Sequence, residues 1–201
     1  MTEAPSKRGR GRPSTGARER ILEAAIEVLK AEGYAGLTVA KVAVRASESK
    51  PLVAYHFGSK QGLVSAAGRE VADLITREVL AEIDGAKTVK QVVEGVCAGT
   101  VRLLDRDVRI GRLYFDLAAV SVVDEDVRKT IGEVNAGWRG VVGDLLKEAG
   151  VPAARARALT VLVIAGNQGL ALERIERGQT PELRKAQDLF VRAVVEVAGA
   201  G

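Results

Sequence analysis

The sequence predicts an all-α protein of about nine helices, in which a short N-terminal three-helix unit is followed by longer helices. Alanine, leucine, glutamate and arginine, which have high helix propensity, are abundant in the 201 residues. Apolar residues recur at helical spacing along most of the chain, whereas alternating β-branched and polar residues are rare. Aromatic residues are scarce, with three Tyr, three Phe and one Trp. We therefore expect helices throughout, apart from the N-terminal tail.

The first sixteen residues differ from the rest of the chain. Residues 1–16 are rich in Gly, Pro, Ser, Thr and Arg and show no apolar periodicity, so we expect a flexible basic arm. From Ala17 on, a helical pattern begins, and Glu32-Gly33 should close it. Its apolar face consists of Ile21, Ala24, Ala25, Val28 and Leu29.

Three hydroxyl residues mark the starts of the next helices. Thr38 is a good N-cap for a short second helix, and the turn that follows it lies at residues 46–48. Ser49 caps a third short helix, whose first turn tolerates Pro51. Ser59 caps a fourth helix. The remaining chain reads as longer helices at about 59–84, 88–105, 107–121, 124–149, 153–177 and 180–198.

Composition excludes several classes of protein. The longest uncharged apolar run, residues 159–166, is far shorter than the roughly 20 residues that a membrane-spanning helix needs. The polar, basic N-terminus has no apolar segment behind it, so we expect no secretory signal peptide. Cys97 is the only cysteine and His56 the only histidine, which leaves neither an internal disulfide nor a Cys/His metal cluster. We expect no metal, no cofactor and no enzymatic activity.

The positive charge is concentrated in the first third of the chain. Residues 1–60 hold eleven Lys or Arg and six Asp or Glu, a balance of +5, whereas residues 61–201 hold nineteen and twenty, a balance of −1. This division indicates that one part meets a polyanion and the other has a different task. A solvated basic tail is the alternative that charge alone leaves open.

Two short helices joined by a tight turn, behind a longer helix and a basic arm, form a candidate helix-turn-helix. The segments TVAKVA at 38–43 and SKPLVAYHFGSKQGL at 49–63 resemble the tetracycline-repressor (TetR) family of transcriptional regulators. The resemblance covers residues 17–64, which we assign to a DNA-binding domain. The C-terminal half has a looser likeness to the choline-regulator-like branch of that family.

The third helix is the expected recognition helix, because donors and small apolar groups stand on the face opposite its core side. The resemblance implies that the positions matching Lys50, Pro51 and Leu52 face bases. It also implies phosphate contacts at the positions matching Thr38, Tyr55, His56 and Lys60, and Ser49 completes the candidate DNA-binding residues. A structural histidine and a core tyrosine are the alternatives for two of them. The turn departs from the family pattern, since Ser47 replaces the usual glycine at a cost of about 1 kcal/mol if left-handed.

The arm carries a second DNA-binding candidate. The segment Arg10-Gly11-Arg12-Pro13 resembles the core of an AT-hook, in which glycine lets the backbone lie flat in a narrow minor groove. Its two arginines, with Arg8 just before them, are the predicted minor-groove contacts. A non-specific basic tail is the alternative.

The resemblance implies that residues 65–201 form a ligand-sensing and dimerisation domain. Bulky or polar groups amid small apolar ones mark the pocket candidates Tyr114, Phe115, Trp138, Asn167 and Gln168, with Asp116 or Asn167 orienting the ligand. Broad apolar faces on the last two helices, which also include Leu172 and Val197, predict dimer contacts from Leu159, Val163, Gly166, Leu170, Phe190 and Val194. For both sets the alternative is an intramolecular core.

Together these patterns predict a cytoplasmic, nucleoid-associated homodimer that represses transcription from a palindromic double-stranded operator and responds to a largely apolar small molecule. The rival is an architectural DNA-binding protein that prefers A·T tracts and has no ligand. An apolar cavity within residues 65–201 would favour the sensor, and a solid core there would favour the architectural protein.

Overall fold

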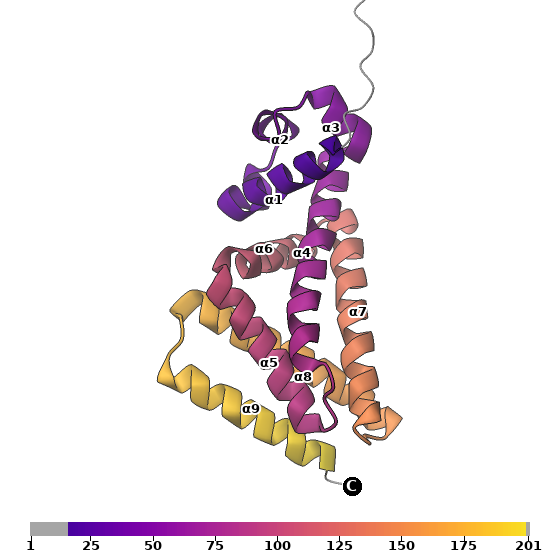
Figure 1. Ribbon diagram of the computed structural model, residues 1–201, viewed down its shortest axis with the longest axis vertical. Coiled ribbons are helices and arrows are strands. Elements are labelled where there is room, and N and C mark those ends of the chain that lie inside the picture. Colours follow the sequence, from indigo (N-terminus) through magenta and orange to yellow (C-terminus); the bar gives the residue numbers. More distant parts are fainter. Residues whose placement is uncertain (1–15, 200–201) are drawn as a thin grey trace, which may run out of the picture.

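The computed structural model describes residues 16–199, and the regular structure within them is entirely α-helical (Figure 1). This part of the chain forms nine helices: α1 (Ala17–Gly36), α2 (Val39–Arg45), α3 (Lys50–Phe57), α4 (Lys60–Ile83), α5 (Val89–Arg106), α6 (Val108–Val120), α7 (Glu125–Glu148), α8 (Ala153–Arg177) and α9 (Pro181–Gly199). The predicted fold class is confirmed. The ends of the six long helices lie within one residue of the predicted positions.

The side chains that the sequence marks as N-caps explain this agreement. The hydroxyl oxygens of Thr38, Ser49 and Ser59 each accept a hydrogen bond from the backbone N–H three residues on, at 3.2, 3.3 and 3.1 Å. Asp107 and Asp124 cap α6 and α7 with their carboxylates. Each cap satisfies a donor that the first helical turn leaves without a partner, and so fixes where the helix begins.

Helix α1 is interrupted where the sequence predicts its end. Gly33 has φ 69° and ψ −176°, a backbone conformation that favours glycine. A β-carbon at Gly33 would also lie 3.1 Å from Asp116 Oδ2 of α6. The chain therefore turns against α6 at this point, and only glycine fits both the conformation and the contact.

The N-terminal unit, α1–α3, forms one end of the molecule, and α4 leads from it into the body beside α7 (Figure 1). Helices α5, α8 and α9 pack together at the other end, and α6 crosses between α1 and the body (Figure 1). Helix α4 runs without a break through residues 64–65, the predicted domain boundary. The two parts are thus joined by a continuous helix and not by a linker.

Two buried apolar clusters stabilise this arrangement. The first joins α1–α3 to α4, α6 and the start of α7, with Ile21, Val53 and Leu113 among its members. The second, which includes Leu146 and Val163, joins α5, α7, α8 and α9 at the far end. Because the first cluster contains residues of α6, the N-terminal unit shares its core with the helix nearest to it.

Candidate DNA-binding surface and internal cavity

The α2–α3 pair is anchored from beneath by apolar side chains. Leu37, Val42, Val53 and Leu63 are fully buried. Between the two helices, Ser47 has φ 55°. It therefore adopts the left-handed conformation for which glycine is the usual residue. The turn is closed by backbone hydrogen bonds from Glu48 N to Ala43 O at 2.9 Å and from Ala46 N to Val42 O at 2.8 Å. These contacts hold α3 rigidly with one face outward.

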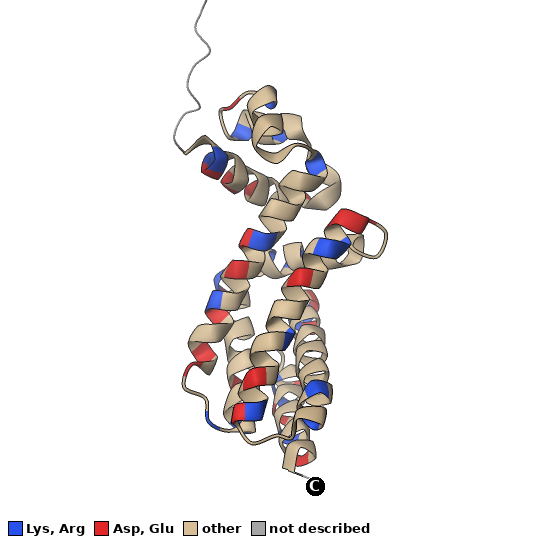
Figure 2. Cartoon of the chain, turned by 90° about the vertical axis from the view of Figure 1, so that its right-hand side faces the viewer, with Lys and Arg blue, Asp and Glu red and all other residues tan. Residues whose placement is uncertain are grey.

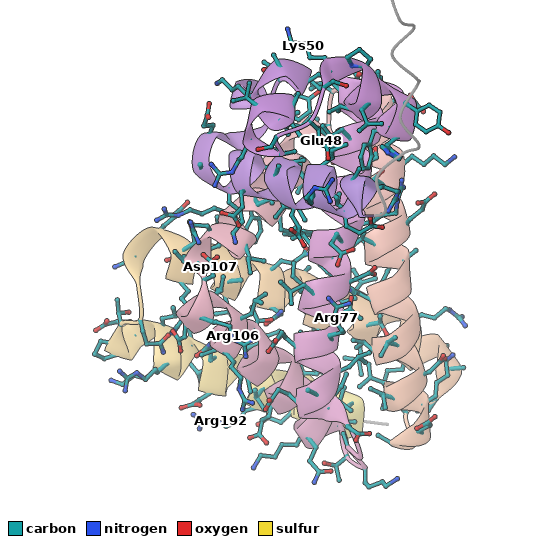
Figure 3. All side chains as sticks on the ribbon, turned by 45° about the horizontal axis from the view of Figure 1, so that its top comes forward. Glu48, Lys50, Arg77, Arg106, Asp107 and Arg192 are labelled. Atoms are coloured by element: carbon teal, nitrogen blue, oxygen red, sulfur yellow. The ribbon has the colours of Figure 1, made fainter. Side chains whose placement is uncertain are left out.

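Several of the predicted DNA-binding residues are exposed on α3 or stand at the starts of α2 and α3. Thr38, Ser49, Lys50 and Pro51 are exposed, and Tyr55 is 73% exposed. Figure 3 shows Lys50 at the outer end of the N-terminal unit, pointing away from the body. Leu52 is half-buried and packs against the first apolar cluster, and so does Phe57, as expected for a core aromatic. The structure therefore brings these predicted residues together on one surface.

Two further predicted residues, His56 and Lys60, are half-buried. Lys60 Nζ donates a hydrogen bond to Tyr34 O at 3.0 Å and lies 4.4 Å from the centre of the Tyr34 ring. The His56 ring lies beside Tyr55 and Phe57, and its Nε2 is buried without a hydrogen-bond partner among the described residues. In the free protein Lys60 is thus held by α1, and a phosphate would have to compete for it.

Most cations of the N-terminal unit are already paired. Lys41 binds Glu32, Arg20 binds Glu48, and Arg45 lies 4.0 Å from Glu27. Arg18 lies 5.4 Å from the centre of the Phe57 ring. Figure 2 shows acidic and basic positions interspersed on α1 and the long helices. Within residues 16–199, Lys50 has no ion pair, so it is the cation of α3 best placed for a new partner.

The predicted arm residues Arg8, Arg10 and Arg12 lie outside the described residues. Their minor-groove role stays a prediction.

The larger part of the molecule contains a partly open cavity of about 90 Å³, bounded by α4, α5, α6, α7 and α8. All five predicted pocket residues line it: Tyr114, Phe115, Trp138, Asn167 and Gln168. Aliphatic side chains of α4 and α5 complete the wall and were missed by the sequence reasoning, because their spacing is that of any core helix. An apolar cavity in this part of the chain is the feature expected of a ligand sensor.

The polar groups of the cavity form short chains of hydrogen bonds. Tyr114 donates to Asn135 Oδ1 at 3.0 Å and accepts from Gln168 Nε2 at 2.7 Å. Asn167 Nδ2 donates to Thr100 Oγ1 at 2.9 Å. Burial raises the pKa of Tyr114, so its hydroxyl stays protonated at neutral pH. These bonds fix both carboxamides in orientation.

Tyr34, near the end of α1, connects the N-terminal unit to the helices around the cavity. Its backbone N–H donates to Asp116 Oδ2 of α6 at 2.6 Å, and its hydroxyl donates to Asp124 Oδ2 at 3.1 Å. Its carbonyl accepts the bond from Lys60 described above. Asp116 therefore holds α1, and the prediction that it orients a ligand is wrong: it is not among the residues that line the cavity.

A second contact joins α1 to the start of α6. Lys30 Nζ lies 2.8 Å from Asp107 Oδ2, and Arg109 Nε donates to Asp107 Oδ1 at the same distance. The hydrogen bond from Arg109, helped by Lys30, holds the pKa of Asp107 well below its usual range. Asp107 therefore remains ionised while it both caps α6 and binds α1.

The predicted dimer residues do not share one environment. Leu159, Val163 and Val194 are buried in the second apolar cluster of their own chain, which is the alternative that the sequence left open for them. Gly166 lies against the Phe190 ring, where a β-carbon would overlap it, and Leu170 is half-buried. The exposed apolar residues are Val161, Leu162 and Leu172 on α8, and Leu189 and Val197 on α9. Leu172 and Val197 were among the predicted apolar faces, whereas the other three were missed, because apolar spacing indicates burial but not what buries a side chain.

Two findings concern other classes of protein. No helix within residues 16–199 is long and apolar enough to cross a membrane. The same residues contain no group of three or more His, Cys, Asp or Glu arranged to hold a metal ion.

The N-terminal part of the chain matches a family of known proteins. Residues 21–67 match the family model for bacterial regulatory proteins of the tetR family. The chain is similar to the HTH-type transcriptional regulator BetI 1 of Chromohalobacter salexigens, with 23% identity over 122 residues, 60% of each chain. It is 40% identical over 63 residues to the HTH-type transcriptional regulator BetI of Paraburkholderia phytofirmans, 29% of this chain and 32% of that protein. The matches thus span less than two thirds of these relatives.

Solved structures share the fold over nearly the whole chain. A transcriptional regulator from Rhodococcus sp. Rha1 superposes with a TM-score of 0.78 and 21% identity, over 92% of this chain and 98% of that one. The multidrug binding protein EbrR, solved with imidazole, superposes with a TM-score of 0.70 and 24% identity, over 92% of this chain and 96% of that one. The family match thus identifies residues 21–67 as a segment of the tetR type, and the solved structures show that the fold is shared over nearly the whole chain.

Proposed function

We propose that this chain regulates transcription as a ligand-responsive repressor, which binds a palindromic operator as a homodimer. The cavity carries this proposal, because an architectural DNA-binding protein has no use for an apolar space that contains a few hydrogen-bonded polar groups. Two structures of one similar protein support the class of function, since EbrR was solved with imidazole and with ethidium.

The DNA contact falls to the exposed face of α3. Lys50, Pro51 and Leu52 at its start meet base edges in the major groove, while Thr38 and Tyr55 contact phosphates on either side. His56 and Lys60 join the phosphate contacts once DNA draws Lys60 from Tyr34. The arm of residues 1–16 adds minor-groove contacts through Arg8, Arg10 and Arg12.

The homodimer forms through the exposed apolar stripes of α8 and α9. Val161, Leu162 and Leu172 fall on one side of α8, and Leu189 and Val197 on one side of α9. Because α8 and α9 pack against each other, these stripes lie on neighbouring helices. Burial against a second copy would remove them from water, and a two-fold axis would present two α3 helices about 34–36 Å apart.

Ligand and DNA communicate through α6. This helix places Tyr114 and Phe115 in the cavity wall and Asp116 on the backbone of Tyr34. A cavity of about 90 Å³ is smaller than the roughly 300–1,000 Å³ of most ligand sites, so an entering ligand must part the surrounding helices. A shift of α6 then moves α1, and with it α3, out of register with one half-site.

The proposal is tested by selecting genomic DNA fragments with the purified full-length protein. We expect enrichment of a palindrome whose half-site centres are one helical turn, or a multiple of it, apart. Enrichment of A·T-rich fragments without a shared palindrome would overturn the repressor and favour the architectural protein. The recovered site would also identify the regulated genes and point to the ligand.

A further inference from the structure

The wall of the cavity contains no charged side chain. Its nineteen lining residues, all within the described part of the chain, include no Asp, Glu, Lys, Arg or His. A charged ligand would therefore leave its water shell without gaining a counter-ion. The nature of the wall thus restricts the class of ligand that it can accept.

Five carboxylates stand next in sequence to lining residues, but none of them lines the wall. Glu78 and Glu82 flank lining residues on α4, but each is held by an arginine of α5, Arg106 at 2.5 Å and Arg102 at 2.6 Å. Asp105 binds Arg174, Asp116 accepts the backbone N–H of Tyr34, and Asp84 is exposed to solvent. A cation therefore finds no counter-ion in the wall.

Two adjacent carboxamides supply the polar selectivity of the wall. The amino groups of Asn167 and Gln168 donate to Thr100 Oγ1 and to the Tyr114 hydroxyl, at 2.9 and 2.7 Å. The carbonyl oxygens of both side chains accept no hydrogen bond within residues 16–199. Around them stand three aromatic rings, with Tyr114 5.2 Å from Trp138 and 5.3 Å from Phe115 between ring centres. The wall thus offers acceptors in an apolar, aromatic setting.

We propose that the effector is an uncharged, largely aromatic molecule that carries an N–H or O–H donor, and that Asn167 and Gln168 select for this donor. The inference rests on the proposed function only in taking the cavity to be the ligand site. It adds the chemical class of the ligand and the two residues that recognise it.

Two probes that share one skeleton test the charge requirement. N-phenyl-1-naphthylamine is neutral and carries one N–H, and 8-anilino-1-naphthalenesulfonate is the same skeleton with an added sulfonate. Ethidium serves as the cation. In fluorescence titrations of the full-length protein, we expect N-phenyl-1-naphthylamine to bind at least tenfold more tightly than either charged probe. Equal or tighter binding of a charged probe would overturn the proposal, as would the absence of binding by all three.

The donor requirement is tested with 1-phenoxynaphthalene, in which an ether oxygen replaces the N–H. We expect it to bind about tenfold more weakly than N-phenyl-1-naphthylamine, a difference of about 1.4 kcal/mol. Asn167→Leu and Gln168→Leu should each reduce this preference, and Gln187→Leu on α9, outside the wall, should leave it unchanged. Thermal unfolding checks that each variant folds. A preference that survives both wall substitutions would show that neither residue recognises the donor.

A negative charge added to the wall should strengthen the binding of a cation. Gln168→Glu places a carboxylate in the wall, so ethidium should bind more tightly and the neutral probe more weakly. Operator binding measured with the same probes separates the two proposals. Selective binding of the neutral probe without any change in operator affinity would sustain the ligand class and refute the regulation. Operator release by a charged probe alone would support the regulation and refute the ligand class.

Discussion

The two ends of this molecule carry function in opposite ways. In the N-terminal unit, buried aliphatic residues such as Val53 serve only to present an exposed face, on which Lys50 and Tyr55 are free to meet a partner. In the larger part, the exposed faces of the helices are not where the ligand candidates lie. The candidates line a space that the packing leaves unfilled. The candidate residues of the N-terminal unit are therefore found by their exposure, and those of the larger part by their position around the cavity.

The largest expected effect falls on assembly, because both half-sites must be engaged together. Leu162→Glu and Leu189→Glu place charges in the exposed stripes of α8 and α9. Each should shift sedimentation from dimer to monomer and weaken operator binding by about a hundredfold or more. Val123→Glu, at an 84% exposed valine in the loop before α7, is the matched control and should change neither. A dimer that survives both substitutions would place the interface elsewhere.

The next effect concerns the arm. Deletion of residues 1–13 removes Lys7, Arg8, Arg10 and Arg12 and leaves the described helices intact. The slope of log affinity against log salt should flatten by about 0.9 for each phosphate that the shortened protein no longer neutralises. If the arm enters the minor groove, the loss of affinity will be larger on operators with A·T-rich flanks, where the groove is narrow. Equal losses on A·T-rich and G·C-rich flanks at matched salt would indicate that the arm is a non-specific basic tail.

The DNA contacts proposed for α3 and the start of α4 comprise base contacts and phosphate contacts. Lys50→Ala should change base preference within the half-site by about 1–3 kcal/mol if Lys50 donates to a guanine. Lys60→Ala should weaken all sequences alike, since a phosphate carries no base information. Lys60→Ala also removes the bond to Tyr34 O, so thermal unfolding must accompany the binding measurement. Selection profiles with the two roles reversed would contradict the placement of α3.

Much of the fold could be predicted from local signals in the sequence. Thr38, Ser49 and Ser59 act within one helical turn, so their caps are visible in the sequence and fix the helix starts. The aromatic and carboxamide residues of the cavity wall stand out in the sequence among aliphatic ones, whereas the aliphatic residues of the wall do not.

Contacts between distant residues were not predictable. Tyr34 and Asp116 are 82 residues apart, and the bond uses a backbone N–H, which every residue but proline possesses. The dimer residues show a related limit. Leu159, Val163 and Leu162 share an apolar character, but only the packing of α8 decides which of them faces the chain's own core. The sequence alone therefore does not indicate which of these side chains is buried.

A moderate effect is expected where the two ends meet. Asp116→Ala leaves the Tyr34 N–H without its acceptor, so amides at residues 33–36 should exchange faster with solvent. In the unsubstituted protein, N-phenyl-1-naphthylamine should alter exchange at these amides through α6. In Asp116→Ala this response should be lost, and any coupling to operator binding should fall by about 0.5–2 kcal/mol. Tyr34→Phe, which removes only the bond to Asp124, is the control. An unchanged response in Asp116→Ala would rule out this route.

The smallest expected effect tests whether charge or packing holds α1 on α6. The pKa of Asp107 is lowered, chiefly by Arg109 and also by Lys30, so its charge stabilises the folded state above the ordinary aspartate pKa. That contribution is lost as the pH falls below this value and through the folded pKa. Asp107→Asn retains a good N-cap but removes the charge, and should lower Tm by about 2–4 °C at pH 7 if about 1 kcal/mol is lost. The gap should close in acid. Asp73→Asn, on the exposed side of α4, should show no gap at either pH. A gap for Asp107→Asn that persists in acid would mean that shape, and not charge, makes the contact.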